Sequence, residues 1–217
     1  MDPFRICLAI GPLSVYCLLL GLMNLSRRPF LTTGARDTAA LGVALAGLAV
    51  VGPLELFMPE AATAQFGQPF VWLLLVSFYV LCVTCLVMLS RPRLVIYNTS
   101  LDELRPVLAE VVAAVDPDAR WAGESLYLPR LGVQLHLDSF PVMRNVSLIA
   151  SGDRQDLAGW RQLEISLASA LSESRAVGGT RGVGMITLAV VLMAASMYYM
   201  LTYPAELAQG MQDMLWR

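Results

Sequence analysis

The placement of arginine around four long apolar runs is the feature that most constrains the fold of this chain. The runs cover residues 6–25, 38–58, 70–90 and 183–203. Each contains about twenty residues, which as a helix is enough to cross about 30 Å of hydrocarbon. We therefore predict four transmembrane helices.

The arginines also predict which side of the membrane each connection faces. They cluster in the connection 26–37 and at both ends of the segment 91–182, whereas the connection 59–69 contains none. Positively charged connections are retained on the cytoplasmic side. We therefore expect residues 91–182 to be cytoplasmic and both chain termini to lie outside.

Composition agrees with a membrane protein and excludes several function classes. The chain is 57% hydrophobic and 15% charged, whereas a soluble domain is about 25% charged. The net charge is −2, so the chain is not expected to bind nucleic acid. All 15 basic residues are arginine, which excludes lysine-based catalysis. Arginine-only basicity is typical of GC-rich bacteria, so we predict the bacterial inner (cytoplasmic) membrane.

The segment 91–182 has the periodicities of a small α+β domain. Ser100 and Glu103 form a capping box that marks a helix start, and Pro106 is expected to bend that helix or to move its start later. Alternating apolar residues predict strands. In chain order we expect a strand at 94–97, a helix at 101–115, strands at 126–128, 131–137 and 146–150, and a helix at about 156–172.

The predicted fold class is a membrane α-helical protein with a β-α-β-β-β-α domain inserted between its third and fourth transmembrane helices. The domain is expected to have an antiparallel sheet with both helices on one face. The predicted organisation is a membrane region at 1–90, the cytoplasmic domain with a glycine-rich hinge at 91–182, and a last helix with an interfacial tail at 183–217.

Glu55 and Pro53 form a candidate membrane site in the second apolar run. Pro53 frees the carbonyl of Ala49 and is expected to kink the helix. An intramembrane carboxylate is a functional candidate. However, Glu55 lies about 25 Å along the helix from the cytoplasmic end, close to the outer interface, which favours a structural role over an ion or proton ligand.

One face of the second run consists of small residues, Ala39, Gly42, Ala46 and Ala49, at spacings of three and four. Small residues let helices approach closely in lipid. We interpret this face as a packing surface, within the chain rather than between copies, although an oligomer contact remains the alternative.

Two further residue patterns occur in catalytic or metal-binding sites, but in this chain both favour a structural role. Cys82 and Cys85 have CxxC spacing, but a thiol in lipid has little thiolate character. His136 and Asp138 share one face of a strand, which is the arrangement of an oriented base and also of an ordinary solvated strand face. We predict no catalytic residue, no metal site and no cofactor.

Phe140, Val142 and Met143 lie in an expected loop between two strands. If they are exposed, they form an apolar tip suited to a partner protein or to the membrane surface. If they fold inward, they belong to the core. The sequence leaves both alternatives open.

The expected function is that of a multi-pass membrane protein whose cytoplasmic domain binds a partner, as a non-catalytic subunit or accessory factor of a membrane complex. The expected partners are the lipid bilayer and a protein partner or a homo-oligomer. The alternative is an oligomeric transporter or channel component that uses the kinked second helix around Glu55.

Overall fold

The computed structural model describes residues 2–26, 28–141, 143–173 and 181–216. The chain folds into two compact units. The first, the membrane unit, contains residues 1–20, 38–88 and 184–217, and the second, the sheet unit, contains residues 21–37 and 89–183. The glycine-rich hinge expected at 177–180 lies outside the described residues.

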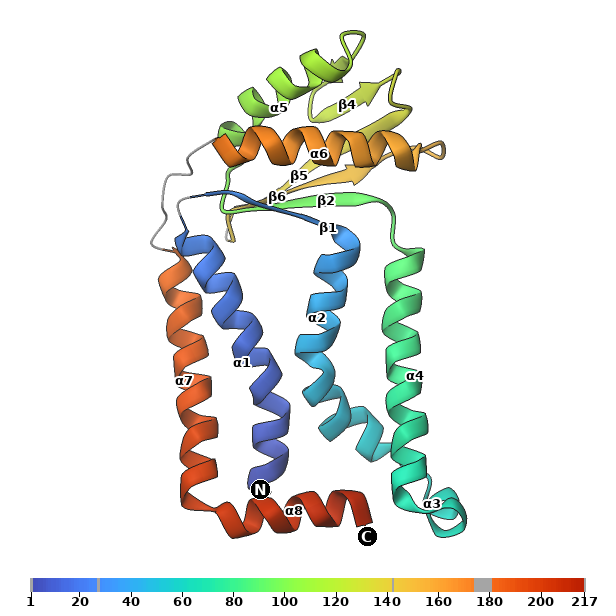
Figure 1. Cartoon of the computed structure of the whole chain (residues 1–217), viewed down its shortest axis with the longest axis vertical. Coiled ribbons are helices and arrows are strands. Elements are labelled where there is room, and N and C mark those ends of the chain that lie inside the picture. The colour runs from blue at the N-terminus through green and yellow to red at the C-terminus, as the bar shows by residue number, and fades with distance from the viewer. Residues whose placement is uncertain (1, 27, 142, 174–180, 217) are drawn as a thin grey trace. The chain divides into compact units, whose positions relative to one another are not determined.

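Four helices are long and apolar enough to cross a membrane, which confirms this part of the prediction. They are α1 (Pro3–Leu25), α2 (Gly34–Ala49) with its continuation η1 (Val50–Leu54), α4 (Gln68–Leu89) and α7 (Arg181–Thr202). In the membrane unit they run side by side (Figure 1). The second span begins at Gly34, before the predicted residue 38, and ends at Leu54 rather than at residue 58.

Pro53, where a kink was expected, lies in a π-helical turn, η1. Proline cannot donate a main-chain hydrogen bond, and its ring clashes with the carbonyl four residues earlier. A wider turn relieves that clash while the helix continues. Beyond it, the connection predicted as a plain loop contains a short helix, α3 (Glu60–Phe66), which ends at Gly67 with a φ of 82°.

Glycines in α2 let this helix contact two neighbours within the membrane unit. A Cβ atom at Gly47 would lie 1.9 Å from the carbonyl oxygen of Leu8 in α1, and one at Gly42 would lie 2.7 Å from Val83 in α4. The hydroxyl of Tyr79 donates a 2.6 Å hydrogen bond to the Gly42 carbonyl. Close helix packing on both sides therefore depends on glycine.

The tail after the fourth span forms a helix, α8 (Pro204–Trp216), that runs across the ends of the spans (Figure 1). Its Met214 carbonyl accepts hydrogen bonds from the Trp72 indole at 2.7 Å and the Gln68 amide at 3.0 Å. Gly210 packs against Asp2 and Phe4. The tail thus joins the beginning of α1 to the beginning of α4.

The sheet unit contains a six-stranded antiparallel sheet with the order β1-β2-β6-β5-β4-β3. The predicted strands correspond to β2 (Arg93–Tyr97), β4 (Ser125–Leu128), β5 (Val133–Phe140) and β6 (Asn145–Ala150). Two strands are additional, β1 (Phe30–Thr33) and β3 (Arg120–Ala122). The predicted order β-α-β-β-β-α was therefore incomplete.

The prediction that this domain is only an insertion between the third and fourth spans is also wrong, because β1 comes from the connection between the first two spans. This strand pairs with β2, with Leu31 opposite Ile96 and Thr32 opposite Val95. Without it, the apolar strand β2 would form an open edge, which is a site of unwanted pairing. Four residues are too short for an alternating pattern to identify the strand.

The beginning of α2 is joined to the same strand. The Asp37 carboxylate accepts a 2.5 Å hydrogen bond from the Tyr97 hydroxyl and a 3.0 Å ion-paired hydrogen bond from Arg93. All three residues belong to the sheet unit. This contact fixes the first turn of α2 on β2.

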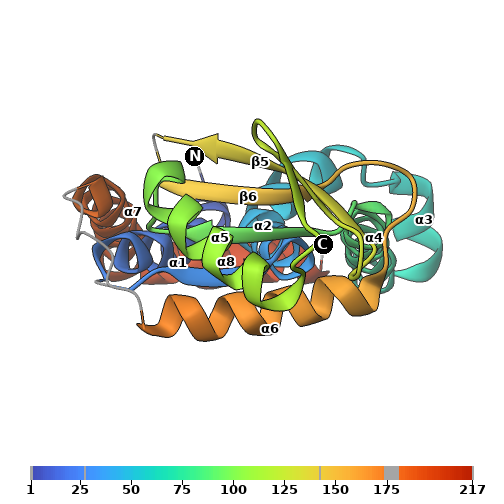
Figure 2. The same ribbon diagram turned by 90° about the horizontal axis from the view of Figure 1, so that it is seen from above.

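Helices α5 (Leu101–Val115) and α6 (Leu157–Glu173) cover one face of the sheet, as predicted (Figures 1 and 2). Their apolar faces and the alternate strand residues form one core, whose fully buried side chains include Ile96, Leu104, Leu108, Leu135, Leu148, Leu163 and Leu167. Helix α5 begins at Leu101 despite Pro106, because the capping box of Ser100 and Glu103 is formed.

Candidate functional site

On the face of the sheet opposite α5 and α6, the side chains of β5 are polar or aromatic and exposed, whereas Val95 and Tyr97 of β2 are buried. Along β5, Val133, Leu135 and Leu137 are buried, whereas the alternate residues from Gln134 to Phe140 are exposed. This alternation is that of a half-solvated antiparallel strand. We refer to the exposed side as the open face.

At the end of the open face, Phe140 and Met143 are exposed, with 53% and 38% of their surface accessible. Phe140 is the last residue of β5, opposite Asn145, so it does not lie in the loop as expected. The strand extends further because β6 provides a pairing partner up to that position. Val142, the third residue of the predicted tip, lies outside the described residues.

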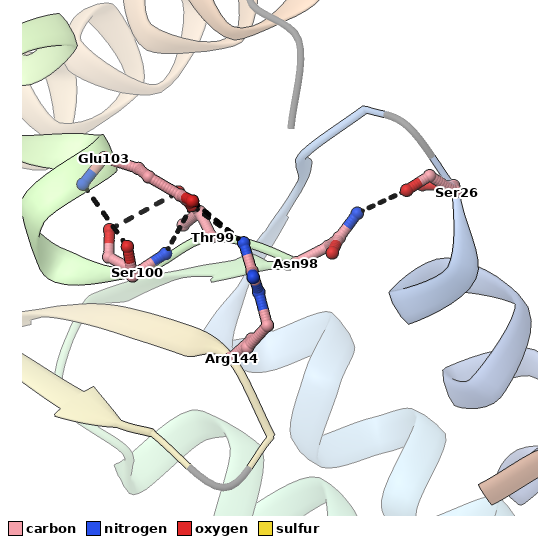
Figure 3. A network of polar contacts seen from close by, with 6 residues as sticks. All are labelled: Ser26, Asn98, Thr99, Ser100, Glu103 and Arg144. Atoms are coloured by element: carbon pink, nitrogen blue, oxygen red, sulfur yellow. Dashed lines mark hydrogen bonds and ion pairs between the residues drawn. The ribbon is translucent and has the colours of Figure 1, made fainter. Parts of the chain in front are cut away.

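The turn that carries Met143 is fixed to the beginning of α5 through Arg144 (Figure 3). The Arg144 carbonyl accepts a 2.9 Å hydrogen bond from the Thr99 amide. The Arg144 guanidinium contacts both Glu103 carboxylate oxygens, at 3.1 and 2.9 Å. The Arg144 side chain is 17% exposed. The exposed residues Phe140 and Met143 therefore lie next to a residue, Arg144, that is fixed by its contacts with Thr99 and Glu103.

Glu103 serves the helix cap and the turn together. Burial raises the pKa of its carboxyl, but the hydrogen bond from the Ser100 main chain and the charge of Arg144 outweigh that effect, and the pKa lies below its ordinary value. The sequence predicted the capping box but not Arg144, because no local spacing connects the two.

Asn98 links the same region to the segment after α1. Its side-chain amide donates a 2.6 Å hydrogen bond to the Ser26 carbonyl (Figure 3). Asn98 is fully buried, with a φ of 60°. Asparagine tolerates this left-handed conformation better than most residues, and that tolerance was the one sequence signal available for the contact.

His136 contacts Ser125 on the open face, where the Ser125 hydroxyl lies 3.2 Å from Nδ1 of the imidazole. Asp138 lies two residues further along the strand, opposite Ser147. His136 and Asp138 are exposed, whereas a catalytic base is usually held in a pocket. This arrangement is typical of cross-strand pairs on a solvated face.

Glu55, in the membrane unit, forms an ion pair with Arg5 of α1. The Arg5 guanidinium also lies 3.6 Å from the Asp2 carboxylate. The pair borders a cleft of about 340 Å³ that we call the Arg5–Glu55 cleft. Its lining residues are Arg5, Glu55, Leu56, Met58, Thr63, Gln68, Trp72, Asp213 and Met214.

Glu55 was identifiable from the sequence, but its partners were not. Arg5, Gln68 and Asp213 lie near the ends of three other helices, so no local pattern joins them. The available signal was Arg5 itself, which lies at the predicted outer end of the first span, where positive charge is unusual.

The predicted small face of α2 lies partly along a second, apolar cavity of about 450 Å³ between α2 and α4. Gly42, Ala49 and Pro53 line this cavity together with Tyr79 and Val83. Ala39 and Ala46 are half-buried. The most buried residues of α2 in the membrane unit, Ala44 and Gly47, lie outside the predicted set.

The cysteine pair lies on α4, with Cys82 half-buried and Cys85 exposed. In the described parts of the chain, no three His, Cys, Asp or Glu side chains gather in a way that could hold a metal ion.

No protein-family model, curated protein or solved structure matches this chain.

Proposed function

We propose that this chain is a multi-pass integral membrane protein that presents its α+β domain to a protein partner, as a non-catalytic subunit or accessory factor of a membrane complex. The observation that carries the proposal is the pairing of exposed apolar side chains, Phe140 and Met143, with an ordered base. A turn whose base is already held in place loses less conformational entropy than a free loop when it binds a partner.

The proposed location is the bacterial inner membrane, with the sheet unit in the cytoplasm and both termini outside. The arginine distribution supports this orientation. In this arrangement the apolar tip is available to cytoplasmic proteins or to the cytoplasmic part of another membrane protein.

Site-specific photo-crosslinking in intact cells tests the proposal. A photoreactive residue replaces Phe140 or Met143 in the full chain, and Leu157 of α6, which is 70% exposed, provides the matched control. We expect a discrete crosslinked product from positions 140 and 143 but not from 157. A product of twice the chain mass identifies a second copy as the partner. Equal labelling at all three positions, or none, contradicts the proposal.

A second candidate function is transport by an oligomer, which is favoured by the π-helical turn at Val50–Leu54 next to the Arg5–Glu55 cleft. Such turns occur often at functional sites. The ion pair with Arg5 would have to open for Glu55 to bind an ion. Flux into liposomes containing the protein tests this function, and Glu55→Gln should then change the flux.

A further inference from the structure

We propose that the open face of the sheet lies against the headgroup layer of the membrane, so that the exposed side chains of β5 contact lipid headgroups rather than bulk water. The proposal rests on the crossing of the membrane by α2 and α4, but not on the proposed protein partner. The contacts that carry it lie within the sheet unit, residues 21–37 and 89–183.

Two strands of the sheet continue directly into candidate spans. Strand β1 ends at Thr33 and α2 begins at Gly34, so no residue separates them. Helix α4 ends at Leu89 and β2 begins at Arg93, and a connection of this length reaches at most about 14 Å when it is fully extended. Both strands are therefore held close to the membrane surface.

The first turn of α2 is attached to the open face. Residues that lie directly opposite each other in an antiparallel sheet share a face. Strand register places Arg93 in one cross-strand row with His136, and Tyr97 in one row with Phe140. Arg93 and Tyr97 therefore point to the open face, and both donate hydrogen bonds to Asp37 in the first turn of α2. The second span thus leaves the sheet from this face.

The length of the second span places the open face at headgroup depth. The span, Gly34–Leu54, contains 21 residues, about 31 Å of helix, which matches about 30 Å of hydrocarbon. Its first turn therefore lies where the hydrocarbon ends and a headgroup layer of about 5–8 Å begins. Because the Tyr97 hydroxyl is 2.5 Å from the Asp37 carboxylate, the sheet is one side-chain length from that boundary.

Exposure on the open face increases with distance from the start of α2. In the cross-strand row through Val95, Ser147 and Asp138, the first side chain is buried, the second is half-buried and the third is exposed. Strand β5 is two strands away from β2, a distance of about 10 Å. The exposed side chains of β5 therefore lie beside the start of a span, where headgroups fill the space.

The side chains of the open face fit a headgroup layer. Tyr127 and Phe30 are 46% and 48% exposed on this face, and aromatic residues are favoured at membrane interfaces. Among the described strands, Arg120 and Asp138 are the exposed charged residues of this face, and their charges are opposite. Contact should therefore occur without anionic lipid. Since Phe140 ends this face, a protein partner would reach it along the membrane surface.

Fluorescence quenching in liposomes tests this contact. In the full chain without its four native cysteines, Asp138→Cys or His136→Cys carries a small fluorophore. The lipid is phosphatidylcholine, a fraction of which has a nitroxide on its headgroup, and iodide on both sides of the membrane is the water-soluble quencher. Ile165→Cys is the matched control, because Ile165 is 63% exposed on α6, which covers the opposite face of the sheet.

We expect the fluorophore at positions 138 and 136 to lose most of its fluorescence to the nitroxide and little to iodide, and the fluorophore at position 165 to show the reverse. The proposal is overturned if positions 138 and 136 behave like position 165. It is also overturned if they are shielded from iodide but not quenched by the nitroxide, which would identify a second copy of the chain as the cover.

Leu81→Cys in α4, where Leu81 is 58% exposed, separates failure of this contact from failure of the membrane assignment. A nitroxide on the lipid acyl chain should quench a fluorophore at this position. Absence of that quenching would contradict the crossing of the membrane, and with it both the proposed function and the headgroup contact. Quenching at position 81 without headgroup quenching at positions 138 and 136 would overturn the headgroup contact alone.

Discussion

The Arg144 guanidinium lies 2.9 Å from the Glu103 carboxylate, although the two residues are 41 positions apart in the chain. This contact joins the turn between β5 and β6 to the first turn of α5. It orders the base of the exposed tip formed by Phe140 and Met143. This ion pair therefore helps to hold the proposed partner surface, together with the main-chain hydrogen bond from Thr99 to Arg144 and the pairing of Phe140 with Asn145.

Arg144→Ala should destabilise the turn and the beginning of α5 by about 1–2 kcal/mol, because a partly buried charge-assisted contact is lost. Arg130→Ala is the control, since its ion pair with Asp118 is largely exposed, at 59% and 62%, and exposed pairs contribute little. Hydrogen exchange of residues 101–106 and 140–145 measures the effect. Equal exchange in the two variants would show that the contact is not important.

The stability contributed by Glu103 should fall in acid. The pKa of its carboxyl is lowered in the fold from an ordinary value of 4.5, so the unfolded chain takes up a proton first as pH falls. The stabilisation is complete above that ordinary value and is lost as pH falls through the folded pKa. The stability difference between the wild type and Glu103→Gln should therefore shrink below pH about 4.5. A difference that grows in acid would contradict the assignment.

Gly47→Ala should destabilise the membrane unit by about 1–3 kcal/mol, the usual cost of overpacking, because the new Cβ would lie 1.9 Å from the Leu8 carbonyl oxygen. At Gly11 of α1, by contrast, a Cβ atom would have no neighbouring atom within 4 Å outside its own helical turn. Gly11→Ala is therefore the matched control and should be neutral or stabilising. The thermal midpoint of the detergent-solubilised protein distinguishes them, and equal midpoints would argue against close packing of α1 and α2.

The pairing of β1 with β2 can be tested by a disulfide. Thr32 and Val95 are directly opposite each other, and such pairs lie about 4.5–5.5 Å apart between Cα atoms, within the range that a disulfide bridges. In a background without the four native cysteines, Thr32→Cys/Val95→Cys should oxidise readily. Thr32→Cys/Tyr97→Cys, out of register by two residues, should not. Similar oxidation of both pairs would contradict the register.

The elements that could be predicted from the sequence are those long enough to show a regular spacing of apolar residues. The four apolar helices, α5, α6 and the strands β2, β4, β5 and β6 belong to this group. Strands β1 and β3 have four and three residues, and their formation depends on a neighbouring strand that is distant in the chain or supplied by a tight turn. Gly123, with a φ of 64°, makes that turn possible for β3.

The candidate sites were predictable one residue at a time but not as groups. Glu55 is conspicuous in an apolar run, but its partner Arg5 is on another helix. Ser100 and Glu103 fit a local motif, whereas Arg144 joins them only through the fold. The π-helical turn was also beyond sequence reasoning, because proline predicts a disrupted helix but not the way in which the helix accommodates it.

Labelling of intact cells with a membrane-impermeant thiol reagent tests the threading of the chain most directly. In a cysteine-free background, Gln65→Cys reports the connection between the second and third spans, and Arg154→Cys reports the sheet unit. We expect Gln65→Cys to be labelled in intact cells and Arg154→Cys to be labelled only after the cells are opened. Labelling of both positions from the same side, or recovery of the chain without detergent in the soluble fraction, would contradict this threading.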